Sequence, residues 1–177
     1  NGGPARDVTP GDFDAPPAVS SSGVDYVFSP DGSSILYLRN PDKVEAISTN
    51  HDIYILPLAG GSARNITTGM NGYDQSPIYT PDGKYLLFRS QATPGFEADR
   101  WRIMRYNPSN GEIVELTRGF DQQVSEMVVS PDSKTIYFNA GERGREPIYS
   151  VPVEPDFRLR IAKKKKKLVS GVYSGSL

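Results

Sequence analysis

One short segment of the sequence gathers side chains that could bind a charged ligand. It reads FEADRW over residues 96–101 and places two carboxylates and a guanidinium between two aromatic rings. In an enclosed site, a carboxylate can hold an ammonium group by a charge-assisted hydrogen bond, and an arginine can pair with a carboxylate. The alternative is that these carboxylates pair with neighbouring arginines at the surface, for little net free energy. Glu97, Asp99, Arg100 and Trp101 are therefore the candidate binding residues.

Catalytic side chains are otherwise scarce. No Gly-x-Ser-x-Gly nucleophile motif occurs, and His51 is the only histidine that could act as a general base. Because His51 lies between two expected strands, we interpret it as the start of a strand rather than as a catalyst. Asn65 matches a glycosylation acceptor by pattern, but its place in the repeat described below assigns it to a strand.

The composition excludes several classes of protein. Among 177 residues, 20 Lys plus Arg stand against 21 Asp plus Glu, so the basic excess usual in nucleic-acid-binding domains is missing. No cysteine is present, which excludes disulfides and thiolate metal sites, and one histidine cannot form a multi-histidine metal site. The apolar runs are too short to span a membrane. We therefore expect no cofactor, no metal, no nucleic acid and no membrane contact.

A turn motif repeats three times, with its prolines 51 and then 50 residues apart. Each copy has Ser or Thr, then Pro and Asp, between two β-rich runs. Proline presets φ for the second turn position, aspartate bonds the local backbone and glycine accepts positive φ, so each copy predicts a tight hairpin. The third copy has Ser133 in place of glycine, and there we expect strain or a different turn type. The turn residues are Pro30, Asp31, Gly32, Pro81, Asp82, Gly83, Pro131 and Asp132. We interpret the three aspartates as turn formers and not as calcium ligands, because no calcium-loop spacing surrounds them.

A second motif of the type Leu-Thr-x-Gly recurs in phase with the turns, at residues 6–11, 64–69 and 114–119 and more weakly at 166–171. Another apolar strand lies between the two motifs in each repeat. Each repeat therefore predicts four antiparallel strands, which for the first are roughly 24–29, 33–39, 52–58 and 63–67. Four-stranded sheets with apolar residues on both faces must stack on one another, which predicts an all-β fold of β-propeller blades.

The blade boundaries follow from the two motifs. We expect blades at 12–69, 70–119 and 120–171, with 1–11 as the last strand of a preceding blade and 172–177 as the start of the next. A closed propeller needs about four to eight blades. The sequence therefore predicts part of a larger propeller, or one that closes by self-association through its open blade faces.

Four connecting stretches carry a family resemblance: residues 9–17, 96–102, 116–121 and 137–144. On these the chain resembles the N-terminal propeller of the prolyl oligopeptidase family of serine peptidases, in particular its bacterial dipeptidyl aminopeptidase and acylaminoacyl-peptidase branch. The blade motif alone is shared with TolB-like propellers, so it indicates the repeat and not the function.

The resemblance implies a specific arrangement. An α/β-hydrolase domain would carry the catalytic triad, and the propeller would admit short peptides and contact their N-terminal end, with Glu97, Asp99, Arg100 and Trp101 as substrate-binding candidates. The partners implied are the missing blades, the hydrolase domain and short peptides, and a periplasmic or secreted location is implied as well. The chain alone should not hydrolyse a peptide. The alternative is a TolB-like, non-enzymatic propeller that binds a protein partner.

One stretch departs from the family pattern. Residues 154–162 and the five lysines Lys163 to Lys167 stand where the connection between the third and fourth strands of the last blade is expected. We interpret the lysine run as a solvated loop, with a contact to an anionic partner as the alternative.

Overall fold

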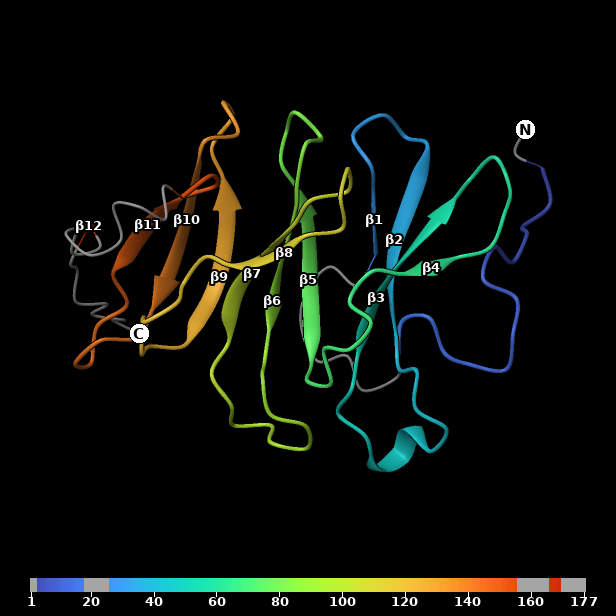
Figure 1. Cartoon of the computed structure of the whole chain (residues 1–177), viewed down its shortest axis with the longest axis horizontal. Helices are drawn as coiled ribbons and strands as arrows, with labels where there is room; N and C mark the ends of the chain where they lie inside the picture. Colours follow the sequence, from blue (N-terminus) through green and yellow to red (C-terminus); the bar gives the residue numbers. More distant parts are fainter. Residues whose placement is uncertain (1–2, 18–25, 156–165, 170–177) are drawn as a thin grey trace, which may run out of the picture.

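The computed structural model describes residues 3–17, 26–155 and the strand at 166–169, and it contains three four-stranded antiparallel sheets (Figure 1). The first sheet has the order β1-β2-β3-β4, the second β5-β6-β7-β8 and the third β12-β11-β10-β9. Figure 1 shows the sheets side by side in chain order, with the N-terminal sheet at one end. The prediction of an all-β fold built from four-stranded antiparallel blades is thereby confirmed.

The strands are short, as the repeat predicts. In the first sheet they are β1 (Tyr26–Phe28), β2 (Ser34–Arg39), β3 (Asp52–Pro57) and β4 (Arg64–Asn65). In the second they are β5 (Asp74–Tyr79), β6 (Leu86–Ser90), β7 (Arg102–Tyr106) and β8 (Ile113–Glu115). In the third they are β9 (Val124–Val129), β10 (Thr135–Ala140), β11 (Ile148–Pro152) and β12 (Lys166–Val169). A 3₁₀ turn, η1 (Glu45–Ile47), lies in the long β2–β3 loop.

The expected domain boundaries stay predictions, although each sheet lies inside one expected blade. Residues 3–11 form no strand in the structure, and the blade that they were expected to complete would need further strands to pair with. Residues 172–177 and Lys163 to Lys165 lie outside the described residues. The backbone of Lys166 and Lys167 belongs to β12, where it pairs with Ser150 and Tyr149 of β11.

The three Pro-Asp turns have one hydrogen-bond pattern. In the first, the Ser29 hydroxyl donates to Asp31 Oδ1 at 2.6 Å and accepts from the Ser34 N–H at 3.0 Å, while Asp31 Oδ1 accepts from the Ser33 N–H at 3.0 Å. The second and third turns repeat these bonds around Asp82 and Asp132. The hydroxyl bond is the main reason that the pKa of Asp31 falls to about 2 and that the pKa of the other two aspartates is lowered.

The second motif supplies a threonine that replaces a backbone acceptor. The Thr67 hydroxyl accepts from the Ile53 N–H at 3.0 Å, and Thr117 accepts from the Ile103 N–H at the same distance. Thr67 is fully buried, and the Asn65 side chain donates to Asp52 Oδ2 at 2.5 Å. Asn65 and Thr67, the two polar residues of the glycosylation-like pattern, therefore stabilise the blade, as the assignment of this pattern to a strand predicts.

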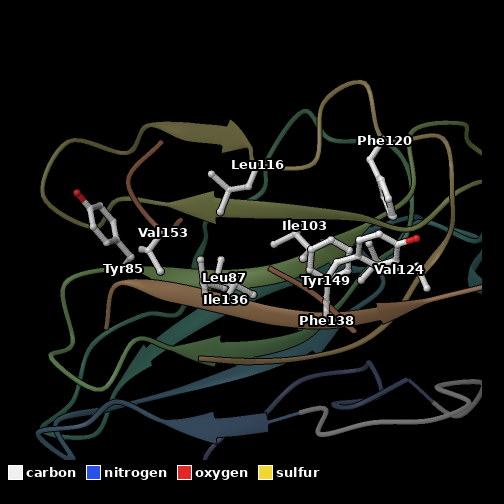
Figure 2. Close-up of a cluster of buried hydrophobic side chains, with 11 residues drawn as sticks. Tyr85, Leu87, Ile103, Leu116, Phe120, Val124, Ile136, Phe138, Tyr149 and Val153 are labelled. Atoms are coloured by element: carbon white, nitrogen blue, oxygen red, sulfur yellow. The ribbon is translucent and has the colours of Figure 1, made fainter. Parts of the chain in front are cut away.

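The middle sheet is buried on both faces because its side chains alternate. Leu86, Phe88 and Met104 belong to a core shared with the first sheet, while Leu87 and Ile103 belong to a core shared with the third. Figure 2 shows the second core, where Leu87 and Ile103 lie among side chains of the third sheet such as Ile136 and Phe138. Burial of each large apolar side chain contributes about 1.5–3 kcal/mol, which explains why β6 is an uninterrupted apolar run at its start.

The outer faces of the stack are less completely covered. On the first sheet, Tyr26 and Phe28 are each 57% exposed, because the intervening Val27 is the residue that points to the core. The N-terminal segment reaches part of this sheet, where the Arg39 guanidinium lies 3.7 Å from the ring centre of Phe13. On the third sheet Val128 is 62% exposed. Both outer sheets therefore present apolar side chains to solvent.

Candidate functional site

A cavity of about 1160 Å³ lies at the end of the sheets opposite the Pro-Asp turns. Figure 1 shows that the two long loops, β2–β3 and β6–β7, gather at this end. The wall is drawn from all three sheets: residues 45–49 and 51 from the first, Tyr73, Gln75, Ser76, Ile78, Arg89, Gln91, Gly95, Glu97 and Trp101 from the second, and Gln123 and Ser125 to Met127 from the third. A hydrogen bond from the Gly95 N–H to Thr49 Oγ1, 2.9 Å long, joins the two loops at the cavity.

The described lining is rich in carboxylates. Glu45, Glu97 and Glu126 each come from a different sheet, and Arg89 is the only Lys or Arg among the described residues of the wall. The formal charge of these four side chains is −2. An electrostatic field of this sign favours a cationic group in the cavity.

The sequence-predicted site residues divide between the cavity and the loop that supports it. Glu97 and Trp101 line the wall, and Asp99 and Arg100 do not. Asp99 accepts hydrogen bonds from the backbone N–H groups of Ala92 (2.8 Å), Thr93 (2.7 Å) and Arg100 (2.7 Å). Burial works to raise the pKa of Asp99, but these bonds outweigh it and the pKa is lowered. Asp99 thus closes the β6–β7 loop that presents Glu97.

The arginines of the segment point to a different carboxylate. Arg100 lies 3.6 Å and Arg102 3.9 Å from Glu115, and Arg118 approaches the same side chain at 3.9 Å. Arg100 and Arg102 therefore pair with a glutamate of β8, and neither of them lines the cavity. Among the described residues these arginines pair with Glu115, whose side chain is 13% exposed, and not with Glu97 or Asp99 at the surface.

Trp101 belongs to a row of aromatic and cationic groups along the wall. Its ring centre lies 5.3 Å from that of Tyr73 and 5.4 Å from the Arg89 guanidinium carbon. Arg89 donates to the carbonyl oxygen of Ser125 and, at 2.9 Å, to the hydroxyl of Ser76. Burial lowers the pKa of Arg89, although a guanidinium keeps its charge in a protein. This arginine therefore connects the second and third sheets at the cavity wall.

Two of the strands that line the cavity are bulged beside it. The pairing of β5 with β6 shifts between Gln75 and Ile78, and the pairing of β9 with β10 shifts between Val124 and Met127. Ser76, inside the first bulge, has φ of +53°, which is unusual for a residue other than glycine. Bulges redirect side chains and are common beside functional sites.

His51 lies at the seam between the first two sheets. It is 1% exposed, its ring packs edge-on against Tyr73 at 4.1 Å, and its carbonyl oxygen accepts from the Asp74 N–H at 2.9 Å. It immediately precedes β3, where the sequence predicts it. Among the described residues, no three His, Cys, Asp or Glu side chains lie close enough to hold a metal ion, and no helix is long and apolar enough to cross a membrane.

Sequence reasoning missed Gln75, Arg89 and Glu126. A signal for two of them is present: Gln75-Ser76 and Ser125-Glu126 are polar pairs at the same distance before the turn proline of their repeats. Arg89 has no such signal, because it sits in an ordinary strand position and is brought to the cavity by stacking.

The fold is that of TolB-like propeller blades. Similar solved structures include a putative TolB from Agrobacterium tumefaciens (TM-score 0.59, 24% identity, covering 83% of this chain and 46% of that one). They also include a puromycin-hydrolysing peptidase from Mycobacterium tuberculosis (TM-score 0.60, 19% identity, 82% and 23%) and an acylaminoacyl peptidase from Pyrococcus horikoshii (TM-score 0.59, 18% identity, 88% and 21%).

Sequence similarity narrows the class further. The chain is 33% identical over 152 residues to dipeptidyl-peptidase 5 of Porphyromonas gingivalis, covering 84% of this chain and 22% of that protein. It is 41% identical over 101 residues to dipeptidyl-peptidase 5 of Porphyromonas endodontalis, covering 55% and 15%. No protein-family model matches. Over most of its length the chain is homologous to dipeptidyl-peptidase 5, of the prolyl oligopeptidase family. It spans about a fifth of the length of these larger relatives.

Proposed function

We propose that this chain is part of the propeller of a serine exopeptidase of the dipeptidyl- or acylaminoacyl-peptidase type, and that its cavity admits and positions short peptides. The observation that carries the proposal is the carboxylate-lined cavity at one end of blades homologous to dipeptidyl-peptidase 5. A free peptide amino terminus is a cation, and carboxylates such as Glu97 can hold it by charge-assisted hydrogen bonds. Trp101 and Ile78 supply apolar surface beside it.

Of the candidates from sequence, Glu97 and Trp101 have positions that support contact with a substrate. Asp99 supports them indirectly, because it holds the backbone of the loop from which Glu97 projects. A substrate contact by Arg100 stays a prediction without a contact to support it, since its guanidinium lies next to Glu115 and outside the cavity wall.

The proposal assigns the chemistry to a hydrolase domain elsewhere in a longer gene product. The full sequence of 177 residues lacks the Gly-x-Ser-x-Gly nucleophile motif, so we expect no hydrolysis from this chain alone. The open faces of the outer sheets would then be covered by further blades of that product. If the chain instead closes its ring with a second copy, light scattering at micromolar concentration will show a dimer or larger species rather than a monomer.

The decisive experiment uses the longer gene product. Its sequence downstream of this segment should contain Gly-x-Ser-x-Gly, and the purified protein should release dipeptides from tetra-alanine or acyl-amino acids from N-acetylated tetra-alanine. Glu97→Gln should raise KM for the free-amine peptide more than for the acetylated one. Glu146→Gln, an exposed glutamate outside the cavity wall, is the matched control. A product without the motif and without either activity contradicts the proposal.

The TolB-like likeness leaves a second candidate, a non-enzymatic propeller that binds a protein partner. If this second candidate is correct, the longer gene product should contain a small non-hydrolase domain and should capture a specific protein partner. The same two measurements therefore separate the candidates, because a peptidase releases product from the peptides and a scaffold does not.

A further inference from the structure

One buried amide on the cavity wall has an unused acceptor. Gln75 of β5 lines the cavity but is only 4% exposed, and its Oε1 has no hydrogen-bond donor in the part of the chain that the structure describes. Buried polar groups in folded proteins are nearly always bonded, so an unbonded one calls for a partner. This observation is independent of the carboxylates of the lining.

The surroundings of Gln75 select the kind of donor that fits. Gln75 lies directly opposite Arg89 in the β5–β6 ladder, and both residues line the cavity. A second cation beside this guanidinium would be repelled, whereas a neutral N–H would not. A cationic group is favoured instead near Glu97, because the charge of Glu126 already interacts with that of Arg89. The position of Gln75 therefore suits a neutral amide N–H rather than an ammonium group.

The amide can turn toward a ligand at little cost. The terminal torsion of a glutamine side chain is broad and roughly two-fold, so Oε1 can swing toward the cavity without leaving a rotamer well. No described hydrogen bond holds Oε1 and would have to break. The bulge between Gln75 and Ile78 already removes the adjacent backbone from regular pairing.

We propose that Gln75 is a ligand-binding residue whose Oε1 accepts a hydrogen bond from a backbone amide N–H of a peptide in the cavity. This inference rests on the proposed function of the cavity as a peptide site and adds the group that reads the peptide backbone. It divides the site into a carboxylate part for the amino terminus and an amide part for the first residues of the chain.

The test measures peptide affinity of the 177-residue chain by isothermal titration calorimetry. The probes are tetra-alanine and three derivatives, each N-methylated at one peptide nitrogen. Gln75→Met keeps the length of the side chain and removes the acceptor, and we expect it to weaken tetra-alanine binding roughly three- to tenfold. One N-methylated peptide should lose a similar factor with the wild type and lose nothing further with Gln75→Met.

A control variant and a stability measurement separate binding from folding. Gln122→Met changes a glutamine outside the cavity wall and should leave the affinity unchanged. Gln75→Met should unfold at the same or a higher urea concentration, because it removes a buried unpaired acceptor; a clear decrease would assign Gln75 a structural partner and overturn the inference. The N-methylated series with the wild type tests the same bond without any substitution.

Two further results would overturn the inference: tetra-alanine affinity unchanged in Gln75→Met, or no binding of tetra-alanine to the wild-type chain. An unchanged affinity in Gln75→Met leaves the proposed function intact, whereas a wild-type chain that binds no tetra-alanine also counts against the cavity as a peptide site. The assignment to a peptidase is decided separately, by dipeptide or acyl-amino-acid release from the longer gene product. Conversely, a Gln75-dependent affinity without such release would retain this inference and remove the peptidase.

Discussion

The hydroxyl of Ser133 accepts a hydrogen bond of 3.0 Å from the backbone N–H of Asp82, and so joins the turns of two neighbouring blades. Ser133 has φ of +61°, close to the values of Gly32 and Gly83 at the same position of the other turns. The third turn is therefore of the same type as the others and is strained, which is one of the two outcomes that the sequence predicts. The strain is accompanied by a contact that glycine cannot make.

We predict that Ser133→Ala is less stable than the wild type by about 1 kcal/mol, because the inter-blade bond is lost and the positive φ remains. Ser133→Gly should lie within about 1 kcal/mol of the wild type, since relief of strain offsets the lost bond. Urea unfolding measures both. An alanine variant as stable as the wild type would show that the bond contributes nothing.

A second prediction concerns the threonine of the Leu-Thr-x-Gly motif. Thr117→Val is nearly isosteric but removes the acceptor of the Ile103 N–H, and leaving this buried donor unpaired should cost about 1–3 kcal/mol. Thr67→Val should cost at least as much, because Thr67 also donates to Asp52 at 3.2 Å. Thr68→Val, at an exposed neighbouring site, is the control and should change the free energy of unfolding by less than about 0.5 kcal/mol.

A third prediction is a pH dependence caused by Asp74. Burial raises its pKa well above the ordinary value, and the nearby Asp52 raises it further, whereas the side chains of Ser90, Thr67 and Arg102 work to lower it. The folded state then holds a proton that the unfolded state releases. The stabilisation is complete below the ordinary pKa of about 3.9 and is lost as pH rises toward the folded-state pKa.

Asp74→Asn should therefore gain stability relative to the wild type as pH increases from about 4 to about 7, by up to about 1.4 kcal/mol per pH unit. Urea unfolding across this range measures the difference. Asp52, whose pKa is also raised by burial, contributes with the same sign in both proteins and largely cancels. A pH-independent difference between Asp74→Asn and the wild type would contradict the prediction.

A fourth prediction concerns the contact between the second and third blades. Arg89→Met removes the donors to Ser125 and Ser76 and should cost about 2 kcal/mol, the usual range for hydrogen bonds from a charged group being about 1.5–3 kcal/mol. Arg118→Met removes a guanidinium that is 75% exposed and should cost less than about 1 kcal/mol. Equal losses in the two variants would mean that the inter-blade bonds of Arg89 add nothing to stability.

The turns were predictable because their chemistry is local. Each turn is held by hydrogen bonds between groups at most five residues apart. In the first, Ser29 bonds Asp31 and the Ser34 N–H, so the turn needs no other part of the chain. The stacking of the sheets was predictable too, because a strand such as β6 with apolar residues on both faces needs another sheet against each face.

The candidate site was predictable only in part. Glu97 and Trp101 reach the cavity because the long loop must project from the end of its blade. Asp99 could have bound a ligand by its residue type, but its carboxylate accepts hydrogen bonds from the N–H groups of Ala92 and Thr93. The residues of the segment do not reveal the loop conformation that makes these bonds.

The sequence by itself determined the repeat, the four-stranded blade and the turn that begins each one, because those features depend on residues close along the chain. Only the tertiary structure decided which side chains line the cavity. Gln75, Arg89 and Glu126 are separated by up to 51 positions and meet through the stacking of two sheets, and the bonds from Arg89 to Ser125 and from Asp82 to Ser133 exist only once those sheets are packed. Side-chain burial and electrostatics at such a seam are properties of the packed blades together.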